Sequence, residues 1–191
     1  MKIQFGEKLD ESLNYFVTSD LHFLHKNILT FSPEYRPWED KEAMTEGLIK
    51  KWNDTVPEEG VVFHLGDFSF GNIQKTKEII SRLNGTIVWL LGNHDRVIRE
   101  QHRSVNKFDL LELRYEGHKV CMMHYAPRVW NQSHRGSIAL WGHSHGSLPP
   151  LGRSMDVGWD AQGKILRLEE AINMCLAKDI HTVDHHTEEG T

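Results

Sequence analysis

Residues 86–95 read Thr86-Ile87-Val88-Trp89-Leu90-Leu91-Gly92-Asn93-His94-Asp95, and the way this stretch is built decides the fold. An apolar, partly β-branched run is followed at once by a glycine and then by side chains that can bind a metal or move a proton. A short apolar run of this kind is typical of a strand that is buried on both faces. The polar side chains therefore stand just past the end of a buried strand.

The same arrangement recurs along the chain. Apolar runs at 15–19, 61–65, 119–123 and 137–141 end at Asp20-Leu21-His22, Gly66-Asp67, His124 and Gly142-His143-Ser144-His145. Between the strand-like runs, residues 39–54 and 72–83 place apolar side chains three and four positions apart, which predicts amphipathic helices. Alternating strands and helices predict an α/β layered fold. Because ligands in open α/β sheets bind beyond the carboxyl ends of the strands, we expect the polar clusters to form one site.

Length and composition limit the possible classes of protein. The chain has 191 residues, which fits one domain, and we expect it to span 1–177 with a flexible tail at 178–191. The net charge of −5 argues against a sequence-independent nucleic-acid binder, which needs a basic face. There is no apolar run of the roughly 18 residues that a membrane span requires, and the first residues lack an apolar leader. We therefore expect a cytoplasmic protein without a membrane partner.

Taken together, the polar clusters have a recognisable order. The series Asp20-x-His22, Gly66-Asp67, Gly92-Asn93-His94-Asp95, His124 and Gly142-His143-x-His145 resembles the calcineurin-like metallophosphoesterase superfamily. The resemblance extends over about residues 15–160. It implies a four-layer αββα sandwich of two mixed sheets flanked by helices, with two metal ions at the edge of the sheets.

The resemblance also implies a role for each motif residue. The first metal ion would be held by Asp20, His22 and His145, the second by Asn93, His124 and His143, and Asp67 would bridge the two. His94 would stabilise or protonate the departing oxygen, and Asp95 would fix the tautomer of His94. Oxygen and imidazole ligands without thiolates suit divalent ions of intermediate hardness, so we expect manganese, with iron, zinc, nickel, cobalt or magnesium as alternatives.

The implied reaction is hydrolysis of a phosphate mono- or diester by a hydroxide held between two divalent ions. We expect a small phosphorylated metabolite or nucleotide as substrate, since the chain has no accessory domain and little basic character. A nuclease or RNA-end phosphatase is the alternative enzyme. A metal-binding scaffold without catalysis is the alternative from another class.

Two segments depart from the common form of the family. Many members have Gly-Asp-x-x-Asp at the second motif, whereas this chain has Phe70 at the last position. The long stretch after the first motif resembles that of small bacterial and phage phosphoesterases. There we predict that His25, Asn27 and Arg36 line the substrate side and contact a phosphate oxygen, because they follow the first ligand pair and the planar guanidinium suits phosphate.

Overall fold

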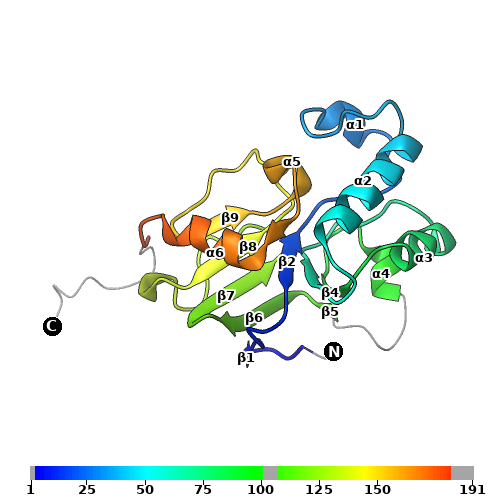
Figure 1. Ribbon diagram of the computed structural model, residues 1–191. Coiled ribbons are helices and arrows are strands. Elements are labelled where there is room, and N and C mark those ends of the chain that lie inside the picture. The colour runs from blue at the N-terminus through cyan, green and yellow to red at the C-terminus, as the bar shows by residue number, and fades with distance from the viewer. Residues whose placement is uncertain (1–2, 101–106, 182–191) are drawn as a thin grey trace, which may run out of the picture.

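The computed structural model describes residues 3–100 and 107–181, which form two mixed sheets (Figure 1). The first, the β3 sheet, has the strand order β10-β2-β3-β4-β5. Its strands are β2 (Tyr15–Thr18), β3 (Val61–His64), β4 (Thr86–Leu90), β5 (Lys107–Phe108) and β10 (Leu166–Arg167). All neighbours are parallel except β10, which pairs with β2 in the antiparallel sense. The carboxyl ends of β2, β3 and β4 therefore lie at one edge.

The second sheet, the β7 sheet, has the strand order β1-β6-β7-β8-β9. Its strands are β1 (Glu7–Lys8), β6 (Leu110–Tyr115), β7 (His118–Met123), β8 (Ile138–Trp141) and β9 (Ser154–Asp156). The pairing of β6 with β7 is antiparallel, and β7, β8 and β9 run parallel. This sheet also brings the ends of two predicted site strands, β7 and β8, to a common edge.

Helices α2 (Lys41–Thr55) and α3 (Ile73–Ser81) pack on the β3 sheet. Each begins at a residue whose side chain caps it: Asp40 accepts the Ala43 N–H and Asn72 accepts the Lys75 N–H. The apolar faces of the two helices bury Met44, Leu48, Trp52 and Ile79 with Val62, Ile87 and Trp89 of the sheet. The remaining helices are α1 (Ile28–Phe31), α4 (Arg96–Glu100), α5 (Trp159–Gln162), α6 (Leu168–Leu176) and a 3-10 turn at Ser133–Arg135.

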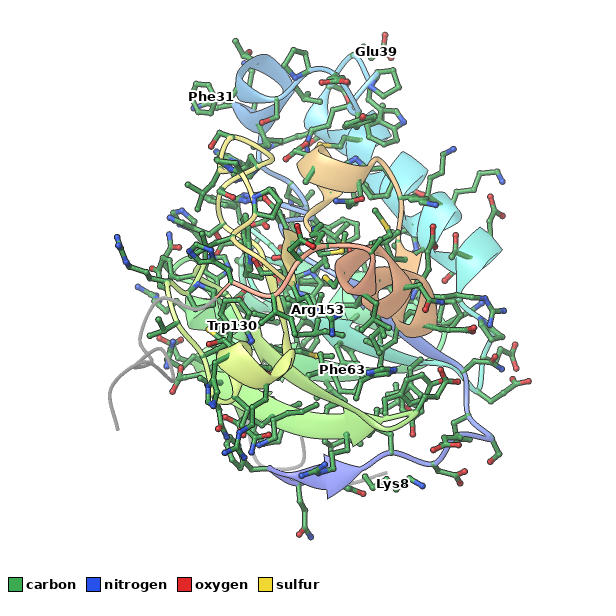
Figure 2. All side chains as sticks on the ribbon, turned by 90° about the vertical axis from the view of Figure 1, so that its left-hand side faces the viewer. Lys8, Phe31, Glu39, Phe63, Trp130 and Arg153 are labelled. Carbon is green, nitrogen blue, oxygen red and sulfur yellow. The ribbon has the colours of Figure 1, made fainter. Side chains whose placement is uncertain are left out.

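The main core lies between the two sheets. Phe63 and Val88 of the β3 sheet belong to the same buried cluster as Leu113 and Met122 of the β7 sheet, and Figure 2 places Phe63 deep in the molecule. Helix α6 contacts β2, β10, β8 and β9, so it joins the two sheets. Two mixed sheets flanked by helices confirm the predicted fold class.

The predicted flexible tail at 178–191 begins within the described part of the chain. Lys178, the first residue of the predicted tail, donates from Nζ to the Ser154 carbonyl at 2.6 Å. Residues 182–191 of that tail lie outside the described part of the chain.

In the part of the chain that the structure describes, no helix combines the length and the apolar character needed to cross a membrane.

Candidate metal centre

The ends of the strands from both sheets meet at one place, where hydrogen bonds link the sheets directly. His124, which follows β7, bonds through Nδ1 to the Leu65 carbonyl after β3 at 2.8 Å. The His143 N–H, after β8, donates to Asp20 Oδ2 after β2 at 2.9 Å. The two sheet edges therefore form a single site, as the shared position of the polar clusters predicted.

Two buried carboxylates lie at the centre of this site, and each has one oxygen held and one turned inward. Asp20 Oδ2 accepts the His143 N–H, while Oδ1 is buried without a hydrogen-bond partner. Asp67 Oδ1 accepts the His94 N–H at 2.9 Å, and its Oδ2 lies 3.8 Å from His22 Nε2 and 3.6 Å from His124 Nε2. Asp67 thus stands between the two groups of histidines.

Glycine is required where the backbone passes these carboxylates. A Cβ on Gly92 would overlap Asp67 Oδ1, and one on Gly142 would lie 2.6 Å from Asp20 Oδ2. Such separations are far shorter than a carbon and an oxygen can tolerate. The close approach therefore explains glycine in both motifs.

The first group of candidate ligands, the Asp20 cluster, consists of Asp20, His22 and His145. Asp20 and His22 are buried, and both ring nitrogens of His22 lack a hydrogen-bond partner. His145 is oriented by Asp160, whose Oδ2 lies 2.6 Å from His145 Nδ1. That contact leaves His145 Nε2 as the nitrogen available to a ligand.

Asp160 is in turn held by a buried arginine. The Arg36 guanidinium donates to Asp160 Oδ1 at 2.7 Å and Oδ2 at 2.9 Å, and it also donates to the carbonyls of Asp20 and Leu21. Burial opposes ionisation of Asp160, yet the hydrogen bonds from His145 and Arg36 hold its pKa below the usual range. The ionised carboxylate in turn raises the pKa of His145, although burial of the imidazole acts in the opposite direction. The ion pair of Arg36 and Asp160 therefore fixes the orientation of His145 in the Asp20 cluster.

The second group, the Asp67 cluster, consists of Asp67, His124 and His143. Because a carbonyl can only accept, the bond to Leu65 places the proton of His124 on Nδ1 and frees Nε2. Asn93 Oδ1 lies 3.0 Å from that Nε2, so the amide oxygen faces the same space. His143 is exposed, and this cluster opens toward solvent.

The backbone is strained at most of these residues. Asp20, His22, Asp67, His143 and His145 all have positive φ angles, between +49° and +69°. A few per cent of residues other than glycine adopt this left-handed region, aspartate and histidine more often than most, and such residues concentrate at functional sites. The surrounding fold therefore forces these side chains inward at a cost in local stability.

The donor set fits divalent metal ions. In each cluster the candidate ligand atoms lie within 4.8 Å of one another, and buried atoms of Asp20 and His22 have no protein partner. A buried carboxylate oxygen without a hydrogen bond is costly, and a cation would satisfy it. Carboxylate, imidazole and amide donors without thiolates are the ligands of ions such as manganese, iron and zinc.

Comparisons with known proteins agree with this geometry. The sequence model of the calcineurin-like phosphoesterases matches residues 13–161, which include every motif residue of both clusters. The chain belongs to the calcineurin-like phosphoesterase family.

Several relatives resemble the chain over most of its length. The uncharacterized protein MJ1445 of Methanocaldococcus jannaschii is 34% identical over 132 residues, 68% of this chain and 68% of the relative. The Gene 66 protein of Mycobacterium phage L5 is 25% identical over 93% of this chain and 98% of its own. A crystal structure of a protein of unknown function, AQ665 of Aquifex aeolicus, shares the fold with a TM-score of 0.64 and 19% identity, covering 85% of this chain and 99% of that one.

His94 lies beside the two clusters without belonging to either. Its side chain is exposed, its ring centroid is 6.0 Å from that of His22, and its backbone N–H donates to Asp67 Oδ1.

The predicted role of Asp95 is corrected by the structure. Its carboxylate accepts the N–H groups of Asp67, Phe68 and Gly92 and makes no described contact with the His94 ring. Asp95 therefore fixes the loop that presents Asp67, and it does not set the tautomer of His94.

The three predicted substrate contacts have different outcomes. His25 lines the space above the clusters, where its ring stacks on Phe70 with centroids 3.9 Å apart. Asn27 is exposed just before α1, and it is not among the described residues that line that space. The expectation for Arg36 is corrected: its guanidinium is buried and occupied by Asp160, so it braces ligands and does not face a substrate phosphate.

Asp160 is the site residue that the sequence analysis missed. It lies in the first turn of α5, 15 residues after His145 and 124 residues after Arg36. The one available signal was Arg36 itself, since an arginine near the first motif needs a carboxylate if it is buried. The sequence did not indicate which carboxylate that would be.

Proposed function

We propose that this protein is a metal-dependent phosphoesterase that hydrolyses a phosphate mono- or diester of a small metabolite or nucleotide. The observation on which this rests is the position of Asp67, whose Oδ2 lies within 4 Å of histidines from both clusters while its Oδ1 is fixed by a backbone N–H. A carboxylate in that position can serve two cations at once.

Each cluster would hold one divalent ion. The first ion would be bound by Asp20, His22 and His145, and the second by Asn93, His124 and His143, with Asp67 shared. We propose manganese as the ion, although the donor set also suits iron, zinc, nickel, cobalt and magnesium. A bound pair of such ions neutralises charge on the phosphoryl group and lowers the pKa of water.

The protein's own residues would position the ester and move a proton. Arg36 and Asp160 would hold His145 and the Asp20 loop rigid, which reduces the reorganisation needed during the reaction. His94 would donate a proton to the departing ester oxygen, since its ring is exposed beside the clusters and its backbone is anchored to Asp67.

The test is hydrolysis of p-nitrophenyl phosphate and bis(p-nitrophenyl) phosphate with each divalent ion in turn. We expect turnover with at least one ion and about two ions bound per chain by elemental analysis. His94→Gln should retain both ions and lower kcat by about 10²–10⁴-fold. Absence of hydrolysis with every ion would favour a metal-binding scaffold, and loss of an ion in His94→Gln would make His94 a ligand.

A further inference from the structure

Two hollows meet at His94. The first, the Phe70 hollow, has a volume of 640 Å³, and its lining includes Phe70, Ile73, His94 and Val97. The second, the histidine hollow, has a volume of 720 Å³, and its lining includes His22, His94, His143 and His145. Histidines from both clusters line only the histidine hollow, whereas His94 lines both. The reacting phosphorus therefore belongs in the histidine hollow, with a second binding space directly beyond His94.

The wall between the hollows is a pair of stacked rings. His25 and Phe70 stack at 3.9 Å with an angle of 9° between their planes. His25 lines the histidine hollow and Phe70 lines the other, so each hollow has one ring of the pair in its wall. The centroid of the Phe70 ring also lies 4.6 Å from that of His94, yet Phe70 remains 40% exposed, so a planar group can still pack against its exposed surface.

The hollows offer little positive charge. Among the described residues that line them, Arg96 is the one lysine or arginine, and its Nε lies 3.2 Å from Glu100 Oε1. The outer part of the histidine hollow is apolar instead, with Phe31 exposed at the end of the molecule opposite Lys8 (Figure 2). A phosphate monoester carries nearly two negative charges at neutral pH, whereas a diester carries one and has two substituents. Two hollows on either side of the proton donor, in which Arg96 is paired with Glu100 and no other lysine or arginine is among the described lining residues, match the single charge and the two substituents of a diester.

We propose, on the basis of the phosphoesterase activity proposed above, that the substrate is a phosphodiester with one ester arm in each hollow and an aromatic ring of the retained arm stacked on Phe70. Hydrolysis adds one water across a P–O bond: the water oxygen joins phosphorus, and the departing oxygen leaves as an alcohol with a proton. His94 lines both hollows, and in this assignment it protonates the departing oxygen of the arm in the histidine hollow, while the arm in the Phe70 hollow stays on phosphorus. The products are an aromatic phosphomonoester and an alcohol.

Three substrates with the same leaving group test this assignment. They are p-nitrophenyl phosphate, which has no second arm, methyl p-nitrophenyl phosphate, whose second arm is small, and bis(p-nitrophenyl) phosphate, whose second arm is aromatic. We expect kcat/KM to rise in that order. A preference for p-nitrophenyl phosphate over both diesters would overturn the proposal and leave the phosphoesterase function intact. Failure to hydrolyse any of the three would instead contradict the function itself.

Phe70→Ala then isolates the stacking surface. We expect it to lower kcat/KM for the diaryl ester about tenfold, and the ratio of diaryl to methyl ester by the same factor, because stacking on one ring is worth that much. Phe5→Ala is the matched control, since Phe5 is also exposed but is not among the described residues that line either hollow. An equal loss for all three esters in Phe70→Ala, or no loss for any, would remove Phe70 from the binding of a second arm.

Discussion

The two ligand clusters differ in how their surroundings hold them. In the Asp20 cluster, Asp20 and His22 are buried, and the half-buried His145 is fixed by Asp160, which accepts two hydrogen bonds from the buried Arg36. In the Asp67 cluster, Asp95 holds the backbone of Asp67, a neutral carbonyl fixes His124, and His143 is exposed. Partners that orient a ligand raise its affinity and slow its motion. We therefore expect the Asp20 cluster to hold its ion more tightly and the Asp67 cluster to exchange its ion more readily.

The largest effect should come from the residue that the clusters share. Asp67→Asn removes the charge that faces both histidine groups, so it should weaken both ions and lower kcat/KM by about 10³-fold, equivalent to several kcal/mol of lost charge stabilisation. Elemental analysis and kinetics measure the two effects. Asp54→Asn, an exposed aspartate of α2 paired with Lys50, is the control and should change neither. Retention of one ion at full affinity in Asp67→Asn would mean that the carboxylate serves a single cluster.

Removing the charge of Asp160 should affect the Asp20 cluster and leave the Asp67 cluster unchanged. Asp160→Asn leaves the buried Arg36 without its counter-charge, which should lower the free energy of unfolding by about 3–5 kcal/mol. It should also weaken the ion of the Asp20 cluster about 10–100-fold and leave the other ion unchanged. Metal titration by calorimetry at a temperature where the variant is folded separates these outcomes. An equal loss of affinity at both clusters would contradict the asymmetry.

A surface pair of the same geometry is the control for this experiment. Arg82 donates to both carboxylate oxygens of Glu46, at 2.7 and 2.5 Å, but both side chains are largely exposed. Glu46→Gln should therefore change the free energy of unfolding by less than about 1 kcal/mol, because solvent screens exposed pairs. Metal affinity should be unchanged. Both variants remove the carboxylate charge from an arginine–carboxylate pair with two hydrogen bonds. A larger loss of stability in Asp160→Asn than in Glu46→Gln would therefore be due to burial of the pair.

The sequence predicted most of what forms the site because the site lies where buried strands end. The five predicted strands became β2, β3, β4, β7 and β8, and the two predicted helices became α2 and α3. Strand β6 was missed because the predicted strands are continuous apolar runs, whereas in β6 the buried Leu111, Leu113 and Tyr115 alternate with Glu112 and Arg114 on the other face of the sheet. Its burial depends on pairing with β7, which a local pattern does not reveal.

The errors at the site have a common physical cause. Asp95 adjoins His94 in sequence, yet the turn after β4 directs its carboxylate to the backbone of Asp67 and Phe68 after β3. Arg36 meets Asp160 only because α5 packs near the first motif in the folded chain. Both interactions join segments that are neighbours in space alone, so spacing along the chain could not predict them.

A smaller effect, on the pH dependence of stability, should come from His64, a buried histidine at the end of β3 that belongs to neither cluster. Burial lowers the pKa of His64 to about 3, whereas an unfolded histidine titrates near 6.5. Between these values the unfolded chain binds a proton that the folded chain does not, so stability falls as pH decreases from about 6.5, by up to about 1.4 kcal/mol per pH unit. His64→Asn keeps an acceptor for the Gly66 N–H and should flatten that slope in urea unfolding of metal-free protein. An unchanged slope would assign the dependence to other groups.

The smallest effect should appear at the edge of the Asp67 cluster. Tyr125 is 54% exposed, its hydroxyl donates to Asn93 Oδ1 at 3.3 Å, and its ring lies 4.6 Å from that of His143. A long, exposed hydrogen bond contributes little, so Tyr125→Phe should weaken the more weakly bound ion by less than about threefold. Tyr125→Ala also removes the ring that restricts His143 and should have the larger effect on the same ion. If Tyr125→Phe instead weakened that ion as much as Asp160→Asn weakens the other, the Asp67 cluster would be braced as firmly as its neighbour, and the expected difference in ion exchange would not exist.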